Sequence, residues 1–230
     1  MRRKSNLPLR LARCAEYIIP APEAPRGGWT DAFPNAAPAS GFRALHAELG
    51  CGKGLFIGGA ASAAADVLFV GIERVADAAV VAAERAREAG LRNVRFIIDD
   101  VSCLPTVFAP GELGLVYINF CDPWPGKKRA KRRLTSDGYL SLYADALAPG
   151  GEIRFKTDSA ELFGFSLERF KASGFALSGI TRDLHGETGE GVPSAAGSFA
   201  VMTDYERKFH SQGVKICACA ATKPYPGTTP

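Results

Sequence analysis

The sequence predicts an α/β fold built on a doubly wound, mostly parallel sheet. Three observations point to it. Short apolar runs alternate with helix-forming stretches from Ala44 onward, a glycine-rich turn follows the first run, and acidic residues follow the ends of successive runs. Alternating strands and helices are typical of parallel sheets covered by helices. Ligands in such folds bind at the carboxyl ends of the strands, so we expect the functional residues there.

Each element is predicted from its composition and boundaries. Apolar runs predict strands over residues 44–49, 67–72, 94–98, 115–119, 152–156, 175–181 and 215–220. Strong helix formers predict helices over 54–65, 76–89, 137–147 and 160–172. Gly90 and Pro149-Gly150-Gly151 are typical helix ends. We predict a domain over 44–230 and an N-terminal arm over 1–43. The rings of Trp29 and Phe33 are expected to pack this arm against the domain.

Composition indicates a globular protein with a concentrated positive patch. The 230 residues are 47% hydrophobic, with 28 basic and 24 acidic residues and a formal net charge of +4. Removing the six cations of residues 127–133 leaves 22 basic and 24 acidic residues, a net charge of −2. Charge gathered in this way is typical of a nucleic-acid contact. A charge run is also commonly just a solvated face.

The six cysteines contain no C-x-x-C pair and no spacing typical of metal ligands, so we predict reduced thiols and no metal. The basic start is followed by Arg10, Arg13 and Glu16, which interrupt any apolar segment. We therefore expect a cytoplasmic protein that does not enter a membrane.

The glycine-rich turn predicts a nucleoside-binding loop. Glu48-Leu49-Gly50-Cys51-Gly52-Lys53-Gly54 has the spacing G-x-G-x-G. A dinucleotide fingerprint needs its third glycine one place later, where this chain has Leu55. The spacing therefore favours the loop of S-adenosylmethionine enzymes, with the backbone of Gly50 and Gly52 close to the cofactor.

Acidic residues at the strand ends complete the predicted cofactor site. Glu73 ends the second strand, where a carboxylate can accept both ribose hydroxyls. Asp100 follows the third strand and can accept the amine of adenine, with Asp99 as its rival. Glu48 can face the positively charged amino-acid end of the cofactor.

The stretch Asn119-Phe120-Cys121-Asp122-Pro123-Trp124-Pro125 is followed directly by six cations in residues 127–133. A carboxylate and an aromatic ring can recognise a base, while clustered Lys and Arg neutralise phosphates. The pattern predicts chemistry on a nucleic-acid base. Trp124 stacks on a base or serves packing, and we expect a surface or packing role for His185 and His210.

With these residues in hand, the chain resembles the bacterial tRNA (guanine-N7-)-methyltransferase family of class I methyltransferases. The similarity runs from Glu48 to the C-terminus through Glu-Leu-Gly-Cys-Gly, Gly71-Ile72-Glu73, the Asp-Pro-Trp segment, Lys131-Arg132-Arg133 and Thr203-Asp204-Tyr205-Glu206. The resemblance implies a seven-stranded Rossmann-like fold, S-adenosylmethionine as cofactor and tRNA as partner. It also implies guanine 46 of the variable loop as the target.

The resemblance also assigns roles to residues. It implies cofactor contacts by Glu48, Glu73, Asp100 and Asp122, with Asp122 also catalytic. It implies substrate contacts by Lys127, Arg132, Arg133, Asp158, Thr203, Asp204, Tyr205 and Glu206. One departure is Gly126, which stands where the family usually has lysine, so Lys127 or Lys128 is expected to substitute. Residues 186–198 are expected to be an inserted loop or a flap that orders with tRNA.

Two alternatives stay open at this level. An amino-methyltransferase acting on adenine or cytosine also has an Asn/Asp-Pro-Pro-aromatic turn, but this chain has a single proline before the aromatic residue. A non-catalytic RNA-binding protein of the same fold is disfavoured by the intact acids at the strand ends. The sequence does not determine whether the protein is a monomer or a homodimer.

Overall fold

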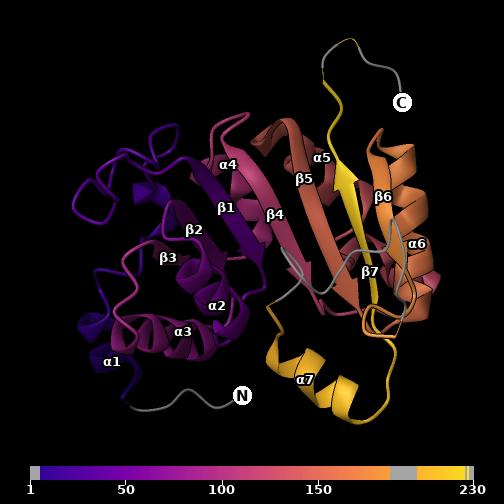
Figure 1. Ribbon diagram of the computed structural model, residues 1–230, viewed down its shortest axis with the longest axis horizontal. Coiled ribbons are helices and arrows are strands. Elements are labelled where there is room, and N and C mark those ends of the chain that lie inside the picture. Colours follow the sequence, from indigo (N-terminus) through magenta and orange to yellow (C-terminus); the bar gives the residue numbers. More distant parts are fainter. Residues whose placement is uncertain (1–5, 187–200, 226, 228–230) are drawn as a thin grey trace. The chain divides into compact units, whose positions relative to one another are not determined.

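The computed structural model describes residues 6–186, 201–225 and 227. By internal contacts the chain divides into two compact units, residues 1–113 and 114–230, which run from indigo to magenta and from magenta to yellow in Figure 1. The strands form a seven-stranded sheet in the order β3-β2-β1-β4-β5-β7-β6. Their bounds are β1 Ala44–Leu49, β2 Val67–Ile72, β3 Val94–Ile97, β4 Leu113–Asn119, β5 Leu147–Thr157, β6 Ala176–Thr181 and β7 Cys217–Thr222.

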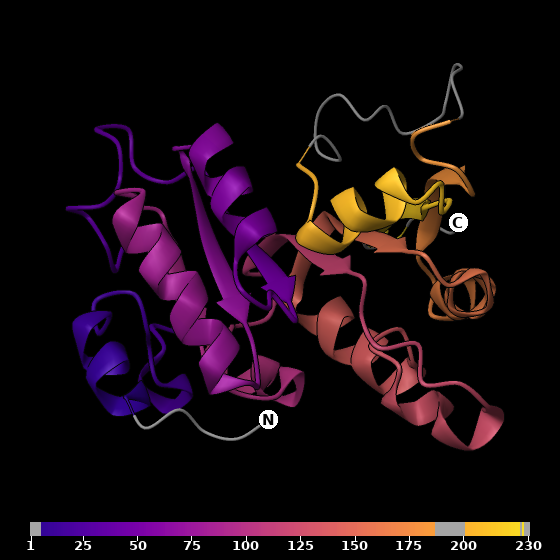
Figure 2. The ribbon, with the colours of Figure 1, turned by 90° about the horizontal axis from the view of Figure 1, so that it is seen from below.

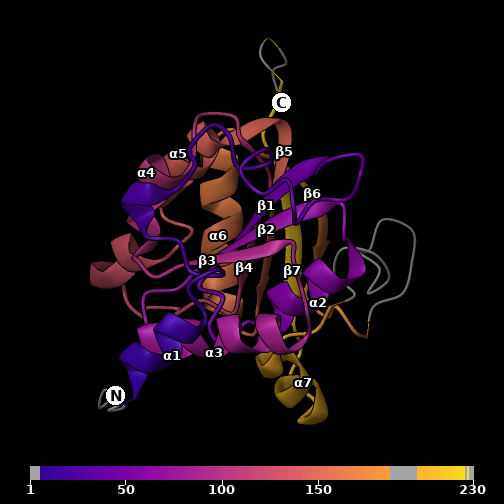
Figure 3. The ribbon, with the colours of Figure 1, turned by 90° about the vertical axis from the view of Figure 1, so that its left-hand side faces the viewer.

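The first unit has parallel strands β1, β2 and β3. Helices α2 (Leu55–Ala63) and α3 (Ala76–Glu88) pack against β2 and β3 and against each other, and Figure 3 turns this part toward the viewer. The register pairs Leu49 with Ile72 and Ile72 with Ile97, so the three strands end together. The segments that follow these strands therefore lie at one edge.

The residues before β1 belong to this first unit. They form α1 (Leu7–Arg13) and the short turn η1 (Ala21–Glu23). The Tyr17 carbonyl accepts a 2.7 Å hydrogen bond from the Phe96 amide, which aligns this segment with β3. The Trp29 ring is fully buried against Phe108, and its indole N–H donates to the Val107 carbonyl at 2.9 Å. The domain boundary after residue 43 stays a prediction.

Two short turns precede the second unit, η2 (Val101–Cys103) and α4 (Leu104–Val107). In the second unit, β7 runs antiparallel to both β5 and β6. Its helices are α5 (Asp137–Ala146), α6 (Ala160–Ala172) and α7 (Asp204–Ser211), with the 3-10 turn η3 (Lys127–Arg132) before them. Phe155 and Phe170 are buried between β5 and α6.

The predicted fold class is confirmed, and several elements differ locally from the prediction. The basic run folds into η3, and β5 begins at Leu147 although the sequence predicts residue 152. Helix α7 was not predicted, because its eight residues are mostly polar. It lies beside the end of β4 (Figure 2). There the Phe120 ring contacts Tyr205 and Phe209. The signal that could have revealed it is Thr203-x-x-Glu206, a capping-box pattern.

Candidate active site

The glycine-rich loop joins β1 to α2 in a backbone conformation that side chains disfavour. Gly50, Gly52 and Gly54 have φ angles of 76°, 56° and 75°. A Cβ at Gly54 would lie 2.6 Å from the Ala82 Cβ, so this glycine also permits the close approach of α2 and α3. Apart from the glycine itself and its two chain neighbours, no described residue has an atom within 4 Å of a Cβ built at Gly50 or Gly52. The loop therefore has space beside its backbone, as a close contact with a nucleoside requires.

Glu73 braces this loop. One carboxylate oxygen accepts from the Gly52 amide at 3.0 Å and the other accepts from the Val75 amide at 2.8 Å. Because Glu73 directly follows β2 and is only half-buried, the bracing holds its carboxylate at the strand ends. The same edge carries Glu48, the buried fifth residue of β1.

Asp99 and Asp100 follow β3 at this edge. Asp99 is exposed, and its Oδ1 accepts from the Asp100 amide at 2.7 Å. Asp100 caps the turn η2, because its Oδ1 accepts from the Ser102 amide at 3.0 Å. The structure thus brings together the five predicted cofactor residues of the first unit, namely Glu48, Gly50, Gly52, Glu73 and Asp100.

The Asp-Pro-Trp segment follows β4 in the second unit and is bounded by strained residues. Phe120 and Trp124 have φ angles of 51° and 41°, which are uncommon for bulky residues. Strain of this kind costs about 1–3 kcal/mol and persists where the surroundings enforce it. Between the two lies Asp122, whose side chain is exposed.

The buried side chain of Arg133 holds this turn in its conformation. Its Nε donates to the Pro123 carbonyl at 3.0 Å, and its Nη2 donates to the Trp124 carbonyl at 3.2 Å. The Arg133 side chain also pairs with Glu161 at 2.8 Å and is itself only 4% exposed. Arg133 therefore clamps the turn that presents Asp122, whereas the resemblance assigned Arg133 to the substrate contacts together with Arg132.

The rest of the basic run faces solvent. The exposed cations of η3 are Lys127, Lys128, Arg129, Lys131 and Arg132. The Arg132 guanidinium lies 4.8 Å from the centroid of the Trp124 ring, so part of the run stacks on the aromatic residue of the turn. Gly126 begins this turn with a φ angle of 85°. A lysine at that position would be strained in this conformation.

Burial, together with the charge of neighbouring Asp122, raises the pKa of the Cys121 thiol to about 12. At neutral pH this thiol is therefore protonated and is a poor nucleophile.

Helix α7 brings the late motif to the ends of β4 and β5. Thr203 and Glu206 form a capping box, in which the Thr203 Oγ1 accepts from the Glu206 amide at 2.9 Å. Tyr205 is 61% exposed and stacks on Phe120 at a centroid distance of 6.4 Å. Because Phe120 is two residues before Asp122, Tyr205 offers an exposed ring near the same turn.

Glu206 is fully buried and ion-paired. Its carboxylate accepts from the Lys156 ammonium at 2.9 Å, and Lys156 is 1% exposed. The His185 ring nitrogen lies 3.0 Å from the other carboxylate oxygen. Glu206 and Thr203 thus hold α7 in place, and among the described side chains of the motif Tyr205 faces outward.

Asp158 directly follows β5 and is exposed. The end of β5 is joined to the end of β4, because the Phe120 amide donates to the Lys156 carbonyl at 2.9 Å. Asp122, Asp158 and Tyr205 therefore share one edge of the second unit. The side chain of Asp204 and nearly all of the predicted loop, residues 187–198, lie outside the described residues.

Within the described ranges, no group of three or more His, Cys, Asp and Glu side chains is arranged to hold a metal ion. None of the described helices has the length and apolar content needed to cross a membrane.

Comparison with known proteins gives a consistent result. A family model described as "Putative methyltransferase" matches residues 43–219. The chain is 39% identical over 215 residues to a protein of Geobacillus kaustophilus named tRNA (guanine-N(7)-)-methyltransferase, covering 94% of this chain and 93% of that protein. A protein of Bacillus subtilis with the same name is 38% identical over 206 residues, covering 90% of each chain.

Solved structures support the fold at lower identity. The 16S rRNA methyltransferase KamB matches with a TM-score of 0.60 and 16% identity, over 80% of this chain and 89% of that one. The [4+2]-cyclase SpnF matches with a TM-score of 0.57 and 20% identity, over 85% of this chain and 80% of that one. A cyclase among these neighbours demonstrates that the fold alone does not define the reaction.

Proposed function

The chain belongs to the tRNA (guanine-N(7)-)-methyltransferase family, and from this premise we propose that it transfers a methyl group from S-adenosylmethionine to N7 of a guanine in tRNA. The target within the tRNA is guanine 46 of the variable loop. The alternatives, an amino-methyltransferase and a non-catalytic RNA-binding protein, are not favoured by these relatives. The observation that carries the proposal is the clamped turn, which presents Asp122 beside five exposed cations.

The residues of the first unit suit the cofactor. The open backbone of Gly50 and Gly52 fits a nucleoside, and the braced carboxylate of Glu73 fits ribose hydroxyls. Asp100 is assigned to adenine, and Asp99, whose Oδ1 accepts from the Asp100 amide, is its alternative. Glu48 is assigned to the positively charged amino-acid end.

The cofactor supplies an activated methyl group on a positively charged sulfur. Guanine N7 carries an in-plane lone pair, so no residue has to remove a proton before attack. The protein's contribution is then positioning of the base and stabilisation of the positive charge that develops on it. Asp122 serves both, since its carboxylate accepts hydrogen bonds from the guanine N–H groups and complements the charge. By resemblance it also contacts the cofactor.

Substrate contacts are assigned to the exposed residues of the second unit. Lys127, Arg132 and the other cations of η3 neutralise phosphates, while Asp158 and Tyr205 lie near Asp122. Arg133, Thr203 and Glu206 support these groups from buried positions. Because its substrate is a cellular RNA, the protein is proposed to work in the cytoplasm.

The test is methyl transfer from radiolabelled S-adenosylmethionine to unmodified tRNA, followed by nucleoside analysis. We expect label in 7-methylguanosine, and its loss when guanine 46 of the transcript is replaced by adenine. Label in a methylated adenine or cytosine would instead favour the amino-methyltransferase. Cofactor binding by calorimetry without any transfer would favour the non-catalytic alternative.

A further inference from the structure

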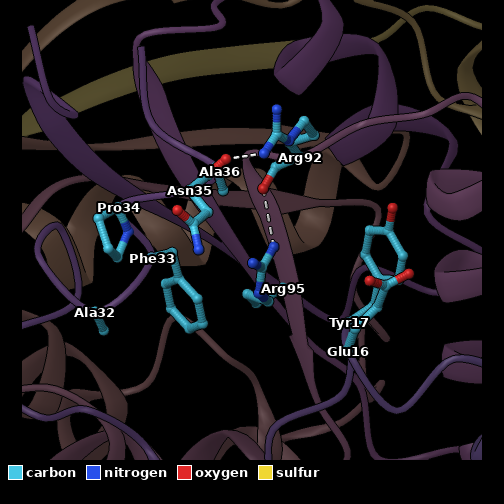
Figure 4. A pocket seen from close by; sticks show the side chains of 9 residues that line it. All are labelled: Glu16, Tyr17, Ala32, Phe33, Pro34, Asn35, Ala36, Arg92 and Arg95. Carbon is cyan, nitrogen blue, oxygen red and sulfur yellow. Dashed lines mark hydrogen bonds between the residues drawn. The ribbon is translucent and has the colours of Figure 1, made fainter. Parts of the chain in front are cut away.

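A cavity of about 390 Å³ lies in the first unit, away from the residues assigned to methyl transfer. It is formed where the residues after α1 and a later part of the N-terminal arm meet the start of β3 (Figure 4). Its functional groups are those of Glu16, Tyr17, Phe33, Asn35, Arg92 and Arg95. A volume of this size suits a ligand larger than a simple ion.

The cavity contains a buried positive charge. Arg95 is only 9% exposed, and among the described residues no carboxylate lies within ion-pairing distance of its guanidinium. Its Nη1 donates to the carbonyls of Arg92 and Val94 at 2.9 and 2.7 Å, while its Nε is buried without a described partner. The charge of Glu16 acts on Arg95 across the cavity without forming an ion pair with it, so the buried Nε is still free to bond an oxygen of an anion.

Neighbouring groups shape what that anion can be. The Phe33 ring lies 4.1 Å from the Arg95 guanidinium and fixes its plane, as Figure 4 illustrates. Arg92, which is exposed, bonds the Asn35 carbonyl and adds a second guanidinium at the same wall. Both arginines line the cavity, and guanidinium groups match the oxygens of a phosphate.

The remaining lining is not suited to a bare anion. Glu16 is a hydrogen-bond acceptor with a charge that repels anions, and Tyr17 contributes an aromatic ring. A carboxylate and a ring beside a phosphate site match the hydroxyls and the base of a nucleotide. Burial also lowers the pKa of the Arg95 guanidinium, in keeping with its exclusion from water.

The cavity is distinct from the proposed methyl-transfer site. Arg92 and Arg95 lie at the amino end of β3, whereas Asp100 and the glycine-rich loop follow the carboxyl ends of β3 and β1. These ends are opposite edges of the first unit, because its three strands are parallel.

We propose that this cavity is a second binding site, which takes a nucleotide unit with its phosphate on Arg92 and Arg95 and its sugar and base beside Tyr17 and Glu16. The unit comes either from a free mononucleotide or from the backbone of tRNA. The first source is independent of the proposed function, and the second rests on it.

The first arm measures binding of uridine monophosphate by calorimetry, because this probe lacks the adenine that a cofactor site would take. We expect saturable binding by the full-length protein, weakened about tenfold in Arg92→Gln, since a charge-assisted hydrogen bond is lost. Arg43→Gln, an exposed arginine outside the cavity, is the matched control. Glu16→Gln should weaken the nucleotide but not inorganic phosphate. Equal affinity for phosphate and nucleotide would overturn the nucleotide assignment.

The second arm measures binding of an unmodified tRNA transcript against salt concentration. If the tRNA backbone is the ligand, Arg92→Gln lowers the affinity and reduces the salt slope by about 0.7, the value for one single-strand phosphate contact. The proposal is overturned if Arg92→Gln and Arg43→Gln behave alike in both arms, with thermal melts that match wild type. Failure of methyl transfer with intact uridine monophosphate binding would count against the proposed function alone.

Discussion

Asp122 carries the catalytic assignment at the scale of a single residue. Asp122→Asn keeps the shape of the side chain but removes the charge that complements the methylated base. We expect kcat for tRNA methylation to fall by about 100-fold or more, in the range found when one stabilising group is removed. Melting should be nearly unchanged, because the side chain is exposed. Turnover close to wild type would refute the assignment.

The buried pair Lys156–Glu206 gives a prediction about stability. Each partner is at most 1% exposed, so removing Lys156 leaves the buried Glu206 carboxylate with the His185 ring beside it but without its cation. Lys156→Met should lower the free energy of unfolding by about 3–5 kcal/mol, measured by urea denaturation. A matched double variant, Lys156→Met with Glu206→Leu, should recover part of this loss because neither charge is then left alone. Equal loss in the single and double variants would contradict an ion-pair origin.

Within the element η3 and the residue that follows it, two adjacent arginines have different surroundings. Arg133 is buried and holds the carbonyls of the Asp-Pro-Trp turn, whereas Arg132 is exposed over the Trp124 ring. Arg133→Gln should therefore lower kcat by about tenfold or more through misplacement of Asp122. Arg132→Gln should chiefly raise KM for tRNA. Steady-state kinetics of the two variants tests this, and each variant serves as the control for the other. A higher KM in Arg133→Gln together with a lower kcat in Arg132→Gln would refute the clamp.

Helix α1 is attached to α3 by a bidentate pair. The Arg10 guanidinium donates to both carboxylate oxygens of Glu84, at 2.7 and 2.5 Å, and this bonding holds the pKa of Glu84 below its usual value. The pair therefore adds stability above the unfolded-state pKa of about 4.3 and loses it as pH falls through the lower folded-state pKa. Glu84→Gln should cost about 1 kcal/mol at pH 7, after allowance for partial exposure. Urea titrations at several pH values should show the difference vanishing in acid.

At the scale of the whole molecule, the net charge of +4 depends on one short segment. The double variant Lys127→Gln/Lys128→Gln should weaken tRNA binding and flatten its dependence on salt by up to about two units of slope. The control is Lys171→Gln/Lys215→Gln, which removes two exposed lysines elsewhere in the second unit. Equal slopes in both double variants would mean that the run is only a solvated face.

The sequence predicted most elements because each is encoded locally. The apolar run over residues 67–72 and the helix over 160–172 have the predicted bounds, since period, composition and end signals agree there. Helix α7 escaped prediction because its helical state depends on the capping box and on Glu206 meeting Lys156, which is 50 residues away. The strand β5 was predicted too short because its first residues pass through Pro149 and two glycines.

By itself, the sequence determined the fold class and the family and proposed the candidate residues for the chemistry, because strand periodicity, glycine spacing and the Asp-Pro-Trp motif are local patterns. Tertiary structure decided which of those residues touch solvent and which support them. Arg133 and Glu206 look like surface charges in the sequence, but they are buried because their partners Glu161 and Lys156 come from distant segments. The cavity at Arg95 is likewise lined by three segments that are separate in the sequence. No local pattern encodes contacts between residues this far apart in the sequence, since these contacts form only when the chain is folded.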